Sequence, residues 1–429
     1  MKKSNNKMLS SISSLGSATL LNAILVFIVE VITRNILGPE KYGYWLTISI
    51  IFTFIPIFQL GTLNAMNREV PYYIARNENN RVREIRETVF SFIFSFPIVL
   101  VLTLFLISII IFITDIKFEY KIGLLLASLI TGFTYLSGYA EMYYKSEQNF
   151  KKASKLISIK SISQSIFTLV MVFYIGYPGL YLGMLIALLI EIYTAKGIFP
   201  KYKRVNSYNE YKKLIKVGFP ILIVGLVWSV MIATDRIIIS IFMTPEDLGN
   251  YGVGLLVFNA MMLFPQVINQ VFYPKIVELV SKENYVEIRK LYWKTNKILA
   301  LIMGLVVLVG FVILPYFINW FMPEYSKGIL AAQVLLVGIY PLTLVGLAAC
   351  YFNSTNKQKM YLSIQLISIF INILLSVVFL SLNDSITSVS IATSITFIIY
   401  FLLMNASFLI IINKDGNQVR FSTSEKITN

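Results

Sequence analysis

Long apolar segments recur along the whole chain, and short polar segments separate them. Most of them contain about 20 residues, the length that an α-helix needs to cross the hydrocarbon core of a bilayer. A helix satisfies its own backbone hydrogen bonds, so it is the expected spanning element. The pattern predicts an all-α polytopic protein with twelve spans, at residues 15–37, 44–65, 89–113, 122–144, 157–175, 180–199, 217–243, 251–271, 298–317, 329–352, 360–380 and 389–412.

Basic residues are distributed unequally between the connecting segments. When both termini are placed in the cytoplasm, 31 of the 37 Lys and Arg residues belong to cytoplasmic segments and six belong to the outer side. Cytoplasmic loops of membrane proteins carry such an excess. We therefore predict that both termini are cytoplasmic. The net charge of +15 is then explained by membrane orientation, and nucleic acid is not an expected partner.

A short motif occurs twice. The sequence Pro-Glu-x-x-Gly begins at Pro39, between the first two spans, and again at Pro245, between spans 7 and 8. A motif that recurs at the same place among long apolar segments indicates an internal repeat. Because six spans make up each repeat, both halves enter the membrane from the same side, as in transporters with parallel repeats. We predict an N-terminal lobe at 1–200 (spans 1–6) and a C-terminal lobe at 201–429 (spans 7–12) with a short polar tail.

The composition argues against several classes of protein. The chain is 57% hydrophobic and 14% charged, which is too little charge for a soluble protein of this length. It has no His, the commonest metal ligand and acid–base residue near neutral pH, and its single Cys cannot form an internal disulfide. No phosphate loop, nucleotide fingerprint or carboxylate cluster of metal-binding type is present. We expect neither an enzyme nor a metal or cofactor site.

Ionisable residues inside predicted spans are candidates for function, because a charge in hydrocarbon needs a partner or a wet cavity. Span 1 contains Glu30 and Arg34, and span 7 contains Asp235 and Arg236. When the two repeats are aligned on Pro39 and Pro245, Arg236 matches the position of Glu30. Arg34 lies one helical turn after Glu30, on the same face of span 1. Two interpretations stay open: the charges converge on a cavity between the lobes, or they form a neutral network that holds the lobes together.

Three more ionisable residues lie in spans 4 to 6. Glu141 and Lys160 are expected near the cytoplasmic ends of their spans, where long side chains can extend to water. Glu191 can do the same or pair with Lys196. We therefore interpret Glu141 and Lys160 as interfacial charges and keep Glu191 as a reserve candidate.

Span 8 carries three amides, Asn259, Gln266 and Gln270, at spacings of seven and four residues. This spacing places them on one face of the helix. Such a polar stripe either hydrogen-bonds to neighbouring helices or lines a water-filled path. Because span 8 directly follows the repeated turn, the path is the favoured interpretation.

The ordered set of motifs resembles the Wzx-type polysaccharide and O-antigen flippases, the polysaccharide transporter branch of the multidrug/oligosaccharidyl-lipid/polysaccharide exporter (MOP) superfamily. The resemblance covers essentially the whole chain. Its motifs are Arg34-x-x-x-Gly38-Pro39-Glu40-x-x-Gly43-x-Trp45, Lys216-x-Gly218-x-Pro220, Asp235-Arg236 followed by Pro245-Glu246-x-x-Gly249-x-Tyr251, and Met322-Pro-Glu-Tyr-x-x-Gly328.

The resemblance implies a V-shaped, MATE-like fold of two six-helix lobes in the bacterial cytoplasmic membrane. The implied function is a flippase that moves undecaprenyl-pyrophosphate-linked oligosaccharide repeat units from the inner to the outer leaflet by alternating access, for O-antigen or capsule biosynthesis. Membrane lipids and the polymerase and export machinery of the same pathway are the implied partners.

The resemblance also implies roles for the candidate residues. Arg34 and Arg236 match cationic positions that border the family's cavity, and a planar, permanently charged guanidinium suits a diphosphate. Asn259, Gln266 and Gln270 are expected to line this cavity. Glu30 and Asp235 are the candidates for coupling transport to a proton or sodium gradient.

Other functions fit the sequence less well than this one. An ion-coupled drug or cation antiporter of the same superfamily would favour an acidic, aromatic-lined pocket, whereas the charges here balance toward positive. The lipid II flippases of the superfamily have two more spans. A polysaccharide polymerase or acyltransferase normally has a large outer loop or catalytic His and Asp residues, and this chain has neither.

Overall fold

The computed structural model describes residues 2–200, 208–355 and 357–428; for 2–22, 208, 270 and 416–428 it describes the backbone alone. Within these residues, every regular element is a helix. The chain divides into two compact units, Met1–Ser229 and Val230–Asn429, and each is described here by itself.

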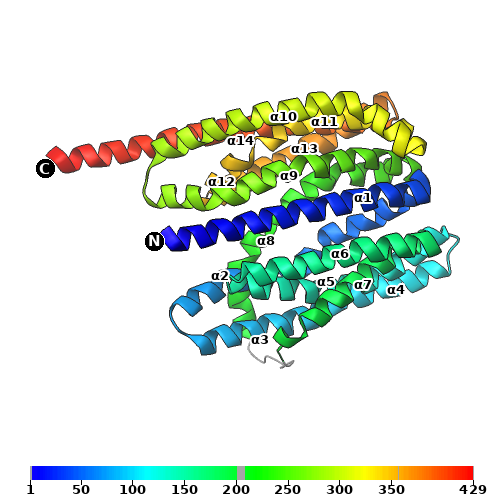
Figure 1. Ribbon diagram of the computed structural model, residues 1–429, viewed down its shortest axis with the longest axis horizontal. Coiled ribbons are helices and arrows are strands. Elements are labelled where there is room, and N and C mark those ends of the chain that lie inside the picture. The colour runs from blue at the N-terminus through cyan, green and yellow to red at the C-terminus, as the bar shows by residue number, and fades with distance from the viewer. Residues whose placement is uncertain (1, 201–207, 356, 429) are drawn as a thin grey trace. The chain divides into compact units, whose positions relative to one another are not determined.

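The first unit is a bundle in which α5 and α6 occupy central positions (Figure 1). Helix α6 packs against α7 and α1, and α5 packs against α7, α4, α2 and α1. The elements are α1 (Lys2–Phe54), η1 (Ile55–Gln59), α2 (Thr62–Ala75), α3 (Asn79–Ser95), α4 (Pro97–Phe112), α5 (Phe118–Ser146), α6 (Phe150–Ile175), α7 (Pro178–Thr194), η2 (Lys196–Ile198) and the first part of α8 (Tyr208–Phe242).

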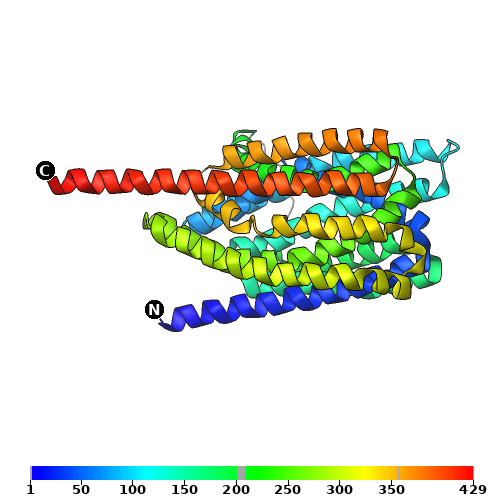
Figure 2. The same cartoon turned by 90° about the horizontal axis from the view of Figure 1, so that it is seen from above.

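The second unit is a bundle around α11 and α14 (Figure 2). Helix α14 packs against α11 and α13, whereas α9 packs against α11 and α12. The elements after α8 are α9 (Pro245–Ser281), α10 (Tyr285–Phe321), η3 (Pro323–Gly328), α11 (Ile329–Thr343), α12 (Gly346–Ser354), α13 (Gln358–Leu382) and α14 (Ile386–Thr428).

The predicted spans coincide with helical segments. In the described part of the chain, nine helices are long and apolar enough to cross a membrane, and the bent pair Ala23–Gln59 and Thr62–Ala75 raises this to ten. Helix α7 is apolar but shorter, and α1 contains the first predicted span and half of the second. From Ile298 to Phe321 the exposed surface of α10 is largely apolar, with Leu301, Leu308 and Trp320 among its most exposed side chains. Such a surface is stable against lipid but not against water.

Two predicted spans are interrupted. In the span predicted at 44–65, the α-helix ends at Phe54. Leu60 and Gly61 then adopt left-handed backbone conformations, and α2 continues at an angle of 50°. The span predicted at 329–352 breaks between α11 and α12, two residues after Pro341. Proline removes a helical hydrogen bond and crowds the preceding turn, so a break close to it is expected.

The repeated Pro-Glu-x-x-Gly motif makes two similar turns by different local means. Gly38 has φ 72° and ψ 170° and divides α1 into two helical segments, a conformation that only glycine adopts readily. In the second copy, Thr244 has extended backbone angles and caps α9. Its hydroxyl accepts a hydrogen bond from the Asp247 N–H (3.2 Å), and its own N–H donates to the Asp247 carboxylate (3.1 Å). Proline then follows as the first helical residue in both copies.

The glutamate of each motif pairs with a lysine from a later connection in the same unit. Lys117 Nζ lies 2.9 Å from Glu40 Oε1, and Lys327 Nζ lies 2.9 Å from Glu246 Oε1. Hydrogen bonds with Tyr44 and Glu40 raise the pKa of the Lys117 ammonium. In both halves the lysine lies between the third and fourth predicted spans. Exposed pairs of this kind contribute little free energy, but their recurrence supports the internal repeat.

Two glycines allow α8 to contact the start of α2. A Cβ atom on Gly218 would lie 1.8 Å from the Gly61 carbonyl oxygen, and one on Gly61 would lie 2.2 Å from the Gly218 carbonyl carbon. Gly61 also has φ +80°. The Lys216-x-Gly218-x-Pro220 motif therefore has a packing explanation, since only glycine permits this backbone contact.

We expect Gly218→Ala to lower the free energy of unfolding by about 1–3 kcal/mol, the usual cost of overpacking a close contact. Gly225→Ala is the matched control, because it lies in the same helix and its Cβ would meet nothing within 4 Å. Thermal unfolding of both purified variants in detergent, followed by intrinsic fluorescence, checks this. Equal unfolding midpoints for the two variants would show that the backbone contact is not required.

Candidate functional site

The first pair of candidate charges lies within α1. Arg34 Nη2 is 3.4 Å from Glu30 Oε2, one helical turn away, and the Arg34 side chain is 2% exposed against 27% for Glu30. The guanidinium carbon also lies 4.1 Å from the centre of the Tyr42 ring. Because Tyr42 follows the Gly38 break, the turn positions this ring over the guanidinium. Arg34 is thus held by a carboxylate and an aromatic face, both of which stabilise a buried cation.

The second pair lies at the contact of α8 and α9. The Tyr251 hydroxyl donates a short hydrogen bond to Asp235 Oδ2, and the Arg236 N–H donates to Asp235 Oδ1 at 2.7 Å. Asp235 is buried, whereas the side chain of Arg236 is partly exposed. The adjacent residues therefore point in different directions, as expected for neighbours on a helix.

Polar groups continue from Asp235 into the contact of α13 and α14. Thr393 lies close to the Tyr251 hydroxyl. The Asn372 amide donates to Thr393 Oγ1 at 3.3 Å, and Ser376 donates to Asn372 Oδ1 at 3.3 Å. Asn372, Ser376 and Thr393 are all buried. Asp235 and Tyr251 thus lie near a second set of hydrogen-bonded polar groups inside an apolar bundle, where an unsatisfied polar group would be costly.

The amides of α9 differ from these buried groups. Asn259 and Gln266 are exposed, and the side chain of Gln270 lies outside the described residues. Whether these amides line a water-filled path stays a prediction. Whether the charges of α1 and those of α8 converge concerns both units and stays a prediction.

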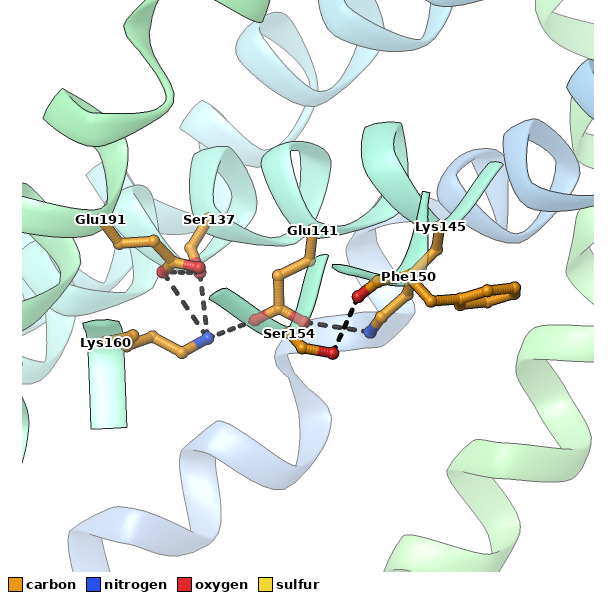
Figure 3. Close-up of polar contacts among 7 residues, drawn as sticks. All are labelled: Ser137, Glu141, Lys145, Phe150, Ser154, Lys160 and Glu191. Carbon is orange, nitrogen blue, oxygen red and sulfur yellow. Dashed lines mark hydrogen bonds and ion pairs between the residues drawn. The ribbon is translucent and has the colours of Figure 1, made fainter. Parts of the chain in front are cut away.

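A third group of charges is formed by α5, α6 and α7 (Figure 3). Lys160 pairs with Glu141 through a short contact, and its Nζ lies 3.6 Å from Glu191 Oε2. Ser137 donates a hydrogen bond to the same Glu191 oxygen at 2.5 Å. Lys160 and Glu141 bind each other between helices, a pairing that the interpretation as interfacial charges did not include; their depth in the membrane stays a prediction.

Of the two alternatives given for Glu191, the pairing with Lys196 is not found in the structure. Lys196 Nζ lies 4.5 Å from the centre of the Tyr193 ring, and the cation next to Glu191 is Lys160. In the sequence, this group of charges was indicated only by the presence of ionisable residues in three successive predicted spans. It could not be interpreted without knowing that α6 and α7 pack side by side.

Metal binding has no support in the described part of the chain, where no three His, Cys, Asp or Glu residues are grouped as a metal site requires. The chemistry that these groups offer is the binding of anions by arginine and the exchange of protons or small cations by buried carboxylates.

Known proteins share this fold. An inward-facing multidrug resistance MATE family transporter of the MOP superfamily matches with a TM-score of 0.78 and 13% identity, over 94% of this chain and 99% of that chain. The lipid II flippase MurJ, in an inward closed conformation, matches with a TM-score of 0.72 and 16% identity, over 94% and 90%. The MATE transporter VcmN of Vibrio cholerae, in its bent form, gives 0.62 and 13%, over 95% and 99%.

The sequence itself matches a family. No curated protein matches the chain. Residues 8–280, more than half of the chain, match the family described as polysaccharide biosynthesis protein. The fold expected from the resemblance is confirmed by the MATE transporters and MurJ. This chain is a multi-pass membrane protein with the fold of the MOP exporters, and it belongs to the polysaccharide biosynthesis protein family.

Proposed function

We propose that this protein is a flippase for undecaprenyl-pyrophosphate-linked oligosaccharide repeat units in the bacterial cytoplasmic membrane. It would move them from the inner to the outer leaflet by alternating access, for O-antigen or capsule biosynthesis. The observation that carries this proposal is the match of residues 8–280 to the polysaccharide biosynthesis family, in a chain with the fold of MATE transporters and a lipid II flippase.

The cationic residues suit the diphosphate of such a substrate. A guanidinium stays charged at every physiological pH and donates two parallel hydrogen bonds to phosphate oxygens. Arg236 is partly exposed, and its buried Nε has no hydrogen-bond partner among the described residues. It is therefore the first candidate for the diphosphate. Arg34 would join it in a conformation that separates the Arg34–Glu30 pair.

The remaining polar groups suit the sugar. Asn259, Gln266 and Gln270 offer donors and acceptors along one face of α9, and sugar hydroxyls need both. The polyprenyl tail would stay in the lipid while sugar and diphosphate cross inside the protein, because its burial in hydrocarbon is favourable throughout.

An ion-coupled drug or cation antiporter is the alternative, since MATE transporters share the fold. A cationic drug would need a carboxylate that is free to bind it. Asp235 already accepts hydrogen bonds from Tyr251 and Arg236, and Glu30 pairs with Arg34. These contacts favour the flippase.

The first prediction of the proposed function concerns Arg236. In proteoliposomes that contain a fluorescent lipid-linked oligosaccharide, we expect Arg236→Ala to slow flipping roughly tenfold or more, the cost of losing a charge-assisted hydrogen bond. Arg236→Lys should fall between wild type and Arg236→Ala, because it keeps the charge but loses the two-pronged donor.

The matched control is Arg83→Ala, which removes an arginine that is 74% exposed and pairs with Glu87. This variant should flip the substrate at the wild-type rate. A wild-type rate for Arg236→Ala would reduce Arg236 to a structural charge. Dye efflux by wild type, without flipping of any of several glycans, would support the antiporter instead.

The second prediction concerns ion coupling. We expect Glu30→Gln and Asp235→Asn to keep exchange across membranes without an ion gradient but to lose the acceleration that a proton or sodium gradient gives. Each substitution keeps the shape of the side chain and removes the charge that binds the ion. Flipping rates with and without an imposed gradient measure this. Gradient-driven flipping by both variants would mean that neither carboxylate binds the coupling ion.

A further inference from the structure

The charges between α5, α6 and α7 form a group that the proposed substrate path does not use. We call it the α5–α7 charge cluster, and it consists of Ser137, Glu141, Lys145, Lys160 and Glu191 (Figure 3). Its contacts run in series. Lys145 Nζ lies 3.1 Å from Glu141 Oε2, Glu141 Oε1 contacts Lys160, and Lys160 lies beside Glu191.

Lys160 is shared unequally between two carboxylates. It makes a short hydrogen bond with Glu141, but its Nζ is 3.6 Å from Glu191 Oε2, beyond hydrogen-bonding distance. Glu141 has a second cation in Lys145, whereas Lys160 is the one cation paired with Glu191 among the described residues. Glu191 is thus the less well neutralised of the two carboxyl groups.

Glu191 is also the most deeply buried member. Its side chain is 0% exposed, compared with 18% for Glu141 and 36% for Lys145. Its Oε2 accepts from Ser137, but its Oε1 is buried and has no hydrogen-bond partner among the described residues. A buried carboxylate in this condition is unfavourable, and taking up a proton removes its charge.

Among the residues whose side chains the structure describes, the elements packed around the cluster supply no other cation paired with it. Helix α1 packs on α5 and α6 and has no charged residue between Lys7 and Glu30, and α4, which packs on α5, has none from Pro97 to Phe112. On η2, Lys196 lies over the Tyr193 ring.

The arginines of α2 and α3, two helices that contact α5, are engaged elsewhere. Arg86 of α3 pairs with Glu147 at the end of α5 (3.0 Å). On α2, Arg68 lies 3.9 Å from Glu69, and Arg76 lies over the Tyr72 ring. The charge balance at Glu191 is therefore decided within the cluster.

We propose that Glu191 is a proton-binding site of this protein, loaded through Glu141 and Lys160 and separate from the coupling candidates Glu30 and Asp235. Lys145 (36% exposed), Glu141 (18%) and Lys160 (24%) are all partly exposed and lie in series before the fully buried Glu191, so the proton would reach Glu191 through them. The proton comes from hydronium, which leaves as water. One carboxylate becomes a carboxylic acid, and the charge of the cluster rises by one.

Protonation changes the interactions between three helices. When Glu191 is charged, it competes with Glu141 for the Lys160 ammonium; when it is neutral, Lys160 binds Glu141 alone. Since these residues belong to α7, α5 and α6, the proton alters which helices the lysine holds together. The link of this event to flipping rests on the proposed function, whereas proton binding itself does not.

Proton binding is tested without transport. Infrared spectra of the purified wild-type protein, recorded across a pH titration, should contain a C=O band of a protonated carboxylic acid that is missing in Glu191→Gln. Glu147→Gln is the matched control, because it removes a carboxylate from an ion pair at the C-terminal end of α5 and should keep the band. Ser137→Ala should shift the band, since it removes the hydrogen bond to Glu191.

Identical titrating bands in wild type and Glu191→Gln would overturn the proposal, and so would a band that Ser137→Ala leaves unshifted. If Glu191→Gln is too unstable to purify, the Ser137→Ala spectrum alone decides.

The link to transport needs a second measurement. In proteoliposomes, Glu191→Gln should keep gradient-free exchange and lose most of the acceleration by a pH gradient, while Glu147→Gln keeps both. Full acceleration in Glu191→Gln would overturn the role of this proton in coupling. A missing band in Glu191→Gln, together with wild-type protein that flips no lipid-linked oligosaccharide, would support the proton site and refute the proposed function.

Discussion

A charged side chain inside a membrane protein must have a partner, and this constraint organises the polar interior of the molecule. Lipid offers no hydrogen bonds, so each buried charge must be satisfied by the protein. Three solutions occur here. The Arg34 cation is held by a carboxylate and an aromatic ring, and the Asp235 carboxylate is held by a hydroxyl and a backbone N–H. The Lys160 ammonium lies between two glutamates. Only the last leaves a carboxylate with an unsatisfied oxygen.

These three solutions suggest a division of labour between residue types. Arginine cannot lose its proton at physiological pH, so it suits a cargo whose own charge is permanent, such as a diphosphate. Carboxyl groups change their charge with their surroundings, so they suit the ions that drive a transport cycle. Glu191 lies on α7, whereas Asp235 and Arg236 lie on α8. Ion binding at Glu191 would therefore act on helix packing rather than directly on the cargo.

The sequence predicted the fold well because its signals are local. Apolar length predicted the spans, and the repeated Pro-Glu-x-x-Gly motif predicted the turns at Gly38 and Thr244. It predicted side-chain partners poorly, because a partner depends on which helices pack together and how each is rotated. The spacing of residues along α5 and α6 does not reveal that Glu141 and Lys160 face each other. The interruptions after Phe54 and Thr343 were missed for a similar reason, since apolar runs continue through them.

The matching Glu40–Lys117 and Glu246–Lys327 pairs have an evolutionary consequence. Each pair closes within its own half, so neither half needs the other to form its turn. A six-span ancestor could therefore have folded as a separate gene product and associated with a second copy of itself. Because an even number of spans returns the chain to the side where it started, fusion of two such genes required no inversion of either copy. Later divergence could then give each half its own cargo-binding and ion-binding residues.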